Sequence, residues 1–194
     1  MINQLKVAER KSFFLMIFEA YKSFSLSYIK QRNNCARERD LLLLAFTGTI
    51  ILFLANIPVQ IAELGIKAEI EKSTYIPMLG FISIFFMPLF LYFISSLLFM
   101  ILKIFNGNAS FYDLRLALFW SLNVAAPLLI INGLLNGFFI NFGGIKYISA
   151  FLQCGVTWII CTMVSEAEQF KSKFPMFFVA ITIIALPFLS SYVS

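Results

Sequence analysis

Five long stretches of the chain carry no charged side chain, and they constrain its fold more than any other feature. They contain 22, 30, 30, 19 and 21 residues, at 41–62, 73–102, 116–145, 147–165 and 174–194. A helix needs roughly 20 apolar residues to cross about 30 Å of hydrocarbon. The sequence therefore predicts an all-α, polytopic membrane protein with five transmembrane helices.

Composition agrees with a membrane protein. Of the 194 residues, 60% are hydrophobic and 13% are charged, and 24 are Phe. A soluble domain carries about 25% charged residues, and disordered chains are poor in aromatic and aliphatic residues. These numbers exclude both classes. We predict an N-terminal segment at 1–40 and a membrane domain at 41–194, with spans at 41–62, 76–103, 114–135, 147–165 and 174–192.

The second half of the third stretch is rich in residues that end helices. Asn-Gly pairs stand at 132–133 and 136–137, and Asn141 is followed by Gly143 and Gly144. Such residues mark turns and loops. We therefore interpret this part as the end of the third span followed by a short exposed loop. A re-entrant segment is the alternative.

Lys and Arg are distributed unevenly between the two ends of the predicted spans. Twelve lie in the N-terminal segment and in the loops after spans two and four, and three lie in the loops after spans one and three. Cytoplasmic loops carry the excess of basic residues. This pattern predicts a cytoplasmic N-terminus and an external C-terminus in the cytoplasmic (inner) membrane of a bacterium.

The N-terminal segment combines basic residues with aromatic ones at near-helical spacing. Residues 4–30 are predicted to form one or two amphipathic helices. Their apolar stripe consists of Leu5, Phe13, Ile17, Tyr21, Phe24 and Tyr28. Such a helix lies in the headgroup plane with its aromatic face in lipid, and its basic residues favour anionic headgroups. A partner-binding helix, or a segment that only fixes orientation, are the alternatives. Nucleic-acid binding is not expected, because the membrane already explains the basic residues.

The residue types that perform much of enzyme chemistry are scarce. There is no His, and the three Cys do not stand at metal-ligand spacing, so no metal, cofactor or catalytic site is predicted. Cys154 and Cys161 lie in an apolar run and are expected to be buried, whereas Cys35 is expected to meet water. No charged residue falls in the middle of a span, which counts against a proton-driven transporter.

Neutral polar residues inside the spans are predicted to pack helices together. One ridge of the fourth span repeats every four residues, at Ser149, Gln153, Thr157, Cys161 and Ser165. Small and hydroxyl side chains let helices approach closely, and a substrate-lined groove is the alternative. In the third span, the Asn123 amide is expected to bond a carbonyl freed by Pro127. Asn123, Gln153 and Thr157 are thus candidate intramembrane packing residues.

Two loops on the predicted cytoplasmic side contain short polar motifs. Ser110-Phe-Tyr-Asp113 is typical of a capping box that starts span three. Glu166-Ala-Glu168 ends span four and is expected to be a solvated helix end, with docking of the N-terminal basic helix as the alternative. The candidate partner-binding residues are Asp113, Arg115, Glu166, Glu168 and Phe170.

At these loops the chain resembles the Yip family, the Ypt/Rab-interacting five-span membrane proteins, and in particular its short bacterial branch. The matching segments are Gly107-Asn-Ala-Ser110-Phe111, Val164-Ser-Glu166-Ala-Glu-Gln-Phe170 and Arg37-Glu38-Arg39-Asp40-Leu41. The resemblance implies five helices, a cytoplasmic N-terminus and a scaffold or partner-binding role instead of catalysis. Eukaryotic relatives engage small GTPases, but this chain lacks their long cytoplasmic region, so a GTPase partner is not expected.

Three functions follow from these observations as hypotheses. The first is a non-enzymatic scaffold that binds other membrane proteins or lipids. The second is a small transporter or channel, with a path lined by Asn123, Asn132, Asn136 and Gln153. The third, an enzyme that acts on lipid, would depend on Asp113, Glu166 and Glu168 as acid or base.

Overall fold

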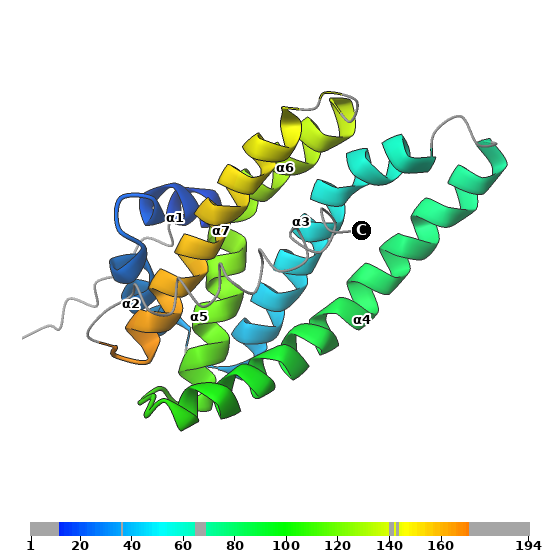
Figure 1. The fold of residues 1–194 in the computed structure, drawn as a ribbon. Helices are drawn as coiled ribbons and strands as arrows, with labels where there is room; N and C mark the ends of the chain where they lie inside the picture. Colours follow the sequence, from blue (N-terminus) through cyan, green and yellow to red (C-terminus); the bar gives the residue numbers. More distant parts are fainter. Residues whose placement is uncertain (1–11, 36, 65–68, 140–141, 143, 171–194) are drawn as a thin grey trace, which may run out of the picture.

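The computed structural model describes residues 12–35, 37–64, 69–139, 142 and 144–170. In this part the chain is all-α, as predicted, and no strand is present. The helices are α1 (Phe13–Ala20), α2 (Phe24–Asn34), α3 (Glu38–Leu64), α4 (Glu69–Ile104), α5 (Phe111–Val124), α6 (Ala126–Phe138) and α7 (Ile145–Ala167) (Figure 1). The predicted span at 174–192 lies outside the described residues.

Three of the described helices are long and apolar enough to cross a membrane. They are Glu38–Ala62 in α3, Thr74–Ile104 in α4, and α7. Helices α5 and α6 make a fourth if the bent pair counts as one span. The first four predicted spans therefore coincide with hydrophobic helices of sufficient length, and the third of them is broken.

The break between α5 and α6 bends the chain by 48° at Ala125. Pro127 stands in the first turn of α6 and has no N–H to give to the carbonyl four residues earlier. Next to this gap, the Val124 carbonyl accepts a hydrogen bond from the Tyr21 hydroxyl at 2.9 Å. The side chain of Tyr21, directly after α1, thus satisfies a backbone group that the break exposes.

Helix α6 continues through the Asn-Gly pairs to Phe138, so our interpretation of residues 136–138 as loop was wrong. The glycines serve close packing instead. A Cβ at Gly133 would overlap the Ala55 carbonyl of α3, and one at Gly137 would lie 2.6 Å from the Pro58 carbonyl carbon. Two glycines four residues apart let helix backbones approach closely in a membrane, and here they seat α6 on α3.

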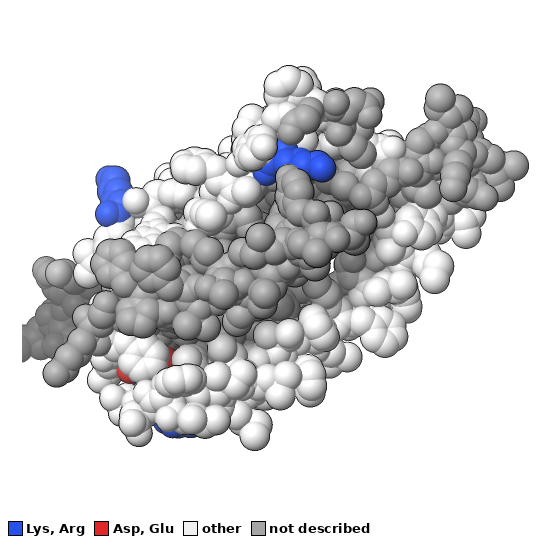
Figure 2. Space-filling model, in the orientation of Figure 1, with Lys and Arg blue, Asp and Glu red and all other residues white. Residues whose placement is uncertain are grey.

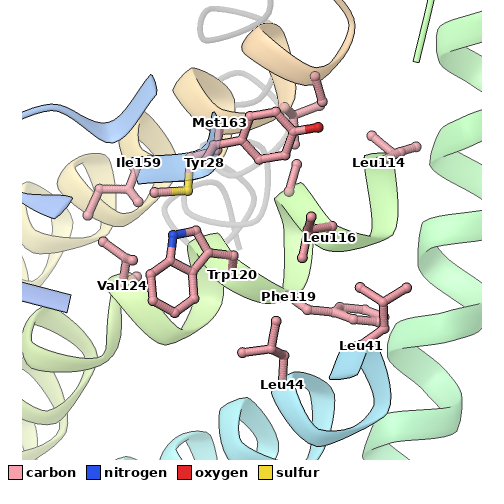
Figure 3. Close-up of a cluster of buried hydrophobic side chains, with 14 of the residues drawn as sticks. Tyr28, Leu41, Leu44, Leu114, Leu116, Phe119, Trp120, Val124, Ile159 and Met163 are labelled. Atoms are coloured by element: carbon pink, nitrogen blue, oxygen red, sulfur yellow. The ribbon is translucent and has the colours of Figure 1, made fainter. Parts of the chain in front are cut away.

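Helix α5 lies at the centre of the bundle and contacts all six other described helices. Nine of its residues are buried. Figure 3 shows Phe119 beside Leu41 of α3 on one side of α5, while Trp120 and Val124 project from the other side. Phe13 of α1 packs edge-on against Trp120, with ring centroids 5.9 Å apart. The core therefore joins the N-terminal helices to the membrane helices.

Helix α4 runs along one side of the bundle and contacts only α3 and α5 among the described helices (Figure 1). Much of its apolar surface is exposed, and the surface along its middle is white in Figure 2, without charged side chains. An exposed stripe along its length contains Phe86, Leu89, Phe93, Leu97 and Met100. We call these five residues the α4 stripe.

Helices α1 and α2 form a hairpin that packs on the bundle through the stripe expected to face lipid. Ile17 and Tyr28 are buried in the core, and Phe13 and Phe24 pack against it. The large apolar side chains that α1 exposes are Phe14, Leu15 and Phe18. Two helices in this segment agree with the prediction, but the face assigned to lipid was wrong for Ile17 and Tyr28, because α5 and α7 cover it.

Candidate functional site

The ends of α4 and α7 terminate with the same backbone motif. Asn106 and Gln169 adopt the left-handed conformation, with φ of 58° and 57°. After each, an N–H bonds back to the helix: Gly107 to the Leu102 carbonyl and Phe170 to the Ser165 carbonyl, both at 3.0 Å. This is the Schellman arrangement. This motif turns the chain sharply after α4 and again after α7, and the two segments lie together.

Glu168 joins these two loops. Its side chain is fully buried, and Oε2 accepts a hydrogen bond from the Ala109 backbone N–H at 2.9 Å. Gly107 makes room for it, since a Cβ at that position would overlap the carboxylate. The expected solvated helix end is therefore wrong for Glu168, which is an internal partner of the loop before α5.

Asp113 joins the start of α5 to α2. Its Oδ1 lies 2.7 Å from Arg32 Nε, and its Oδ2 accepts from Arg32 Nη2 at 2.8 Å, so the pair is bidentate. Ser110 caps α5 as predicted, because its Oγ accepts from the Asp113 N–H at 3.1 Å. The Ser110 hydroxyl in turn donates to Asp113 Oδ2 at 2.7 Å. Asp113 is only 8% exposed, and its carboxylate has several hydrogen-bond partners.

A second ion pair joins the start of α3 to α5. Arg115 Nη2 lies 2.7 Å from Glu38 Oε1, and the Arg115 guanidinium stacks over the Phe111 ring at 4.2 Å. Nearby, the Tyr112 hydroxyl donates to the Cys35 carbonyl at 3.0 Å. We call Arg32, Glu38, Asp113, Arg115 and Glu168 together the clasp. The clasp holds α2, α3, α5, α7 and the α4–α5 loop at one end of the bundle.

Tyr28 and Cys35 are buried beside the clasp. The Tyr28 hydroxyl points to the Asp113 carbonyl at 3.5 Å, and burial, together with the charge of Asp113, raises its pKa well above the ordinary value of 10.0. Burial also raises the pKa of the Cys35 thiol, which accepts from Gln31 Nε2 at 3.0 Å. The expectation that Cys35 meets water was wrong: Cys35 is buried, and Cys154, expected to be buried, is exposed.

The structure brings the predicted partner-binding residues to one end, although two of them face inward. Asp113 and Glu168 are buried, Glu166 is half-buried, and Phe170 packs against the core. Helix α2 does pack on α7, but Arg32 of α2 pairs with Asp113 of α5. Neither Arg32 nor Glu38 was predicted as a site residue: Glu38 lies in the segment 37–41 that carries the resemblance, and nothing in the sequence distinguishes Arg32 from the other charges near span one.

The polar residues within the spans form separate sets of hydrogen bonds. Asn123 is fully buried and donates to the Leu44 carbonyl at 2.9 Å and to Phe119 at 2.7 Å. The expected bond to a carbonyl freed by Pro127 was therefore wrong. Asn136 donates to Asn132 Oδ1 and to Ser149 Oγ, and Thr157 donates to the Gln153 carbonyl. These bonds join α3 to α5 and α6 to α7. Asn123 belongs to the first of these contacts, whereas Asn132 and Asn136 belong to the second.

The N-terminal hairpin encloses a groove of about 1030 Å³ beside the clasp. It is lined by both helices of the hairpin and by Trp120 of α5.

Among the described residues, no group of three or more Cys, Asp and Glu could hold a metal ion. No protein-family model, curated protein or solved structure matches the chain.

Proposed function

We propose that the chain is a non-enzymatic membrane scaffold, of the Yip-like type, that binds other membrane proteins. It would lie in the cytoplasmic membrane of a bacterium, with its N-terminus and the clasp on the cytoplasmic side. The contacts of the clasp support this placement, because they gather the N-terminal segment and the loops after spans two and four at one end. These are the segments that carry the excess of basic residues.

The observation that carries the proposal is the contrast between the polar groups and the α4 stripe. Asp113 and Glu168 join segments of the chain to one another. The large apolar side chains of α4 point away from the described bundle, with Phe86, Leu89 and Phe93 exposed by 60%, 67% and 59%. In a membrane, such a surface can pack by van der Waals contact against a helix of a second protein.

Photo-crosslinking from the stripe in native membranes tests the proposal. A photoreactive phenylalanine analogue at Phe86 or Phe93 should capture one or a few discrete proteins. The matched control is Phe151 of α7, which is 78% exposed. Capture of lipid alone from all three positions would contradict a scaffold. Partner capture from Phe151 and not from α4 would contradict the α4 stripe as the binding surface.

A further inference from the structure

The groove between α1 and α2 is lined by both polar and apolar side chains. Lys22, Ser23, Lys30, Asn33 and Asn34 contribute polar side chains. Phe13, Met16, Leu26 and Trp120 contribute apolar surface. A ligand that fills it must therefore have a polar and an apolar part.

Contacts between the hairpin and α5 fix the position of the groove along α5. Helix α2 runs antiparallel to α5: Arg32 pairs with Asp113, and Ser27 Oγ accepts from Trp120 Nε1 at 2.9 Å. Beyond α2, Tyr21 reaches Val124. Asp113 and Val124 are eleven positions apart in α5, which is about 16 Å of helix. If α5 and α6 are one span, the hairpin and its groove lie alongside this part of the span.

Polar side chains beside a membrane span need hydrogen-bonding or charged partners. Acyl chains cannot hydrogen-bond, and unsatisfied polar groups in hydrocarbon are costly. Lys22 and Lys30 exceed the single acidic lining residue, Glu19, which lies 4.0 Å from Lys30. A second hollow shares Phe13, Gln31 and Asn34 with the groove. At the start of α3 this second hollow is lined by Arg37 and Arg39, and by one acidic residue, Asp40.

Gln31 adds a second, independent indication. It lines both hollows and is 6% exposed. Its Nε2 bonds Cys35, but its Oε1 has no hydrogen-bond partner in the described part of the chain. Of the five buried side-chain oxygens without a hydrogen-bond partner among the described residues, Gln31 Oε1 alone belongs to a residue that lines these hollows. A ligand here should therefore offer a hydrogen-bond donor as well as a negative charge.

We propose that this groove binds an anionic phospholipid whose headgroup carries hydroxyls. Lys22 and Lys30 hold the phosphate, and a headgroup hydroxyl donates to Gln31 Oε1. The acyl chains leave over Leu26 and the exposed Phe14 and Phe18. The inference rests on the membrane placement proposed above, but not on the scaffold role.

Trp120 reports on occupancy, because it lines the groove and the chain has only one other Trp. The Trp158→Phe variant is reconstituted into nanodiscs that contain either brominated phosphatidylglycerol or brominated phosphatidylcholine. At equal mole fraction, phosphatidylglycerol should quench Trp120 fluorescence at least twofold more. The double substitution Lys22→Gln/Lys30→Gln should bring the ratio to one. Lys146→Gln, which removes an exposed charge at the start of α7, should leave it unchanged.

Each other result overturns a distinct part of the inference. Equal quenching by both lipids in the parent, or a preference that survives the double substitution, overturns the lipid site. Loss of the preference on addition of millimolar inorganic phosphate shows a free-anion site instead. Absence of quenching by either lipid overturns the membrane placement itself. If Trp158→Phe does not fold, native mass spectrometry of the unmodified chain replaces it, and it should show phosphatidylglycerol retained by the parent and lost from the double variant.

Discussion

At the scale of single residues, glycine determines how closely α6 approaches α3. We expect Gly133→Ala to destabilise the protein by about 1–3 kcal/mol, because its Cβ would meet the backbone of Ala55, which cannot rotate away. Gly155→Ala is the matched control, since its Cβ would meet only the end of the Leu128 side chain, at 3.3 Å. Thermal unfolding in detergent measures both variants. Equal melting temperatures for the two would contradict the close contact.

The raised pKa of Tyr28 predicts a loss of stability at alkaline pH. The folded chain keeps a proton that the unfolded chain releases near the ordinary pKa of 10.0. The contribution of Tyr28 is therefore constant below about pH 10, and the free energy of unfolding falls as pH rises above that value. The measurement is the unfolding midpoint of the parent and of Tyr28→Phe between pH 8 and 11. The variant should lose less stability across this range, and parallel curves would refute the assignment.

The clearest wrong predictions also concern single residues. Asn-Gly pairs indicate turns when only local preference is considered, yet Gly133 lies within α6 because α3 approaches it there. Glu168 looked solvated because a helix end usually is, but the loop with Gly107 and Ala109 covers it. Both contacts join residues far apart in sequence, and no local pattern contains them. Ser110 was predicted correctly because its cap is local.

At the scale of helices, the clasp is expected to couple α2 to α5. A double-mutant cycle with Arg32→Gln and Asp113→Asn should give a coupling energy of about 1 kcal/mol. This value is at the upper end of the range for exposed ion pairs. The bidentate geometry and the buried Asp113 strengthen the pair, whereas the half-exposed Arg32 side chain weakens it.

The second pair of the clasp supplies the comparison for that cycle. Arg115→Gln with Glu38→Gln should give a smaller coupling, because the Glu38 side chain is 61% exposed. Unfolding in a denaturing detergent series measures both cycles. A coupling near zero for Arg32 and Asp113 would show that α2 is held by apolar packing alone.

Charge-free stretches predicted the positions of α3, α4 and α7, although α4 begins at Glu69, seven residues before the predicted span. The third span was only partly predictable. Pro127 indicates a weak point, but the carbonyl of Val124 beside the break bonds to Tyr21, which lies 103 residues before Val124 in the chain. A contact of that range is determined by tertiary packing and not by helix preference.

At the scale of the whole molecule, orientation remains a prediction that labelling can test. In a background without the three native Cys, Asn108→Cys should react with a membrane-impermeant maleimide only from the cytoplasmic side. Tyr147→Cys, at the opposite end of the bundle, should react only from outside. Both native side chains are exposed. Labelling of both positions from one side would contradict the alternation of spans, and the reverse pattern would invert the orientation.

The general architecture was therefore more predictable than the surfaces that would recognise a partner. Hydropathy establishes that the chain is a set of apolar helices. It does not show that the basic segment folds back along α5 and encloses a groove. That groove needs residues from α1, α2 and α5 at once, and none of them forms a motif alone.

The long range of the hairpin contacts has a consequence for how the protein is made. Arg32 and Tyr21 bond to residues 81 and 103 positions later. At about 5–20 residues per second, several seconds pass between the synthesis of the hairpin and that of α5. During this interval Tyr28 and Ile17 lack the helix that buries them. The first two spans would enter the translocon before the N-terminal hairpin reaches its final position. The segment that is synthesised first is therefore among the last to form its native contacts.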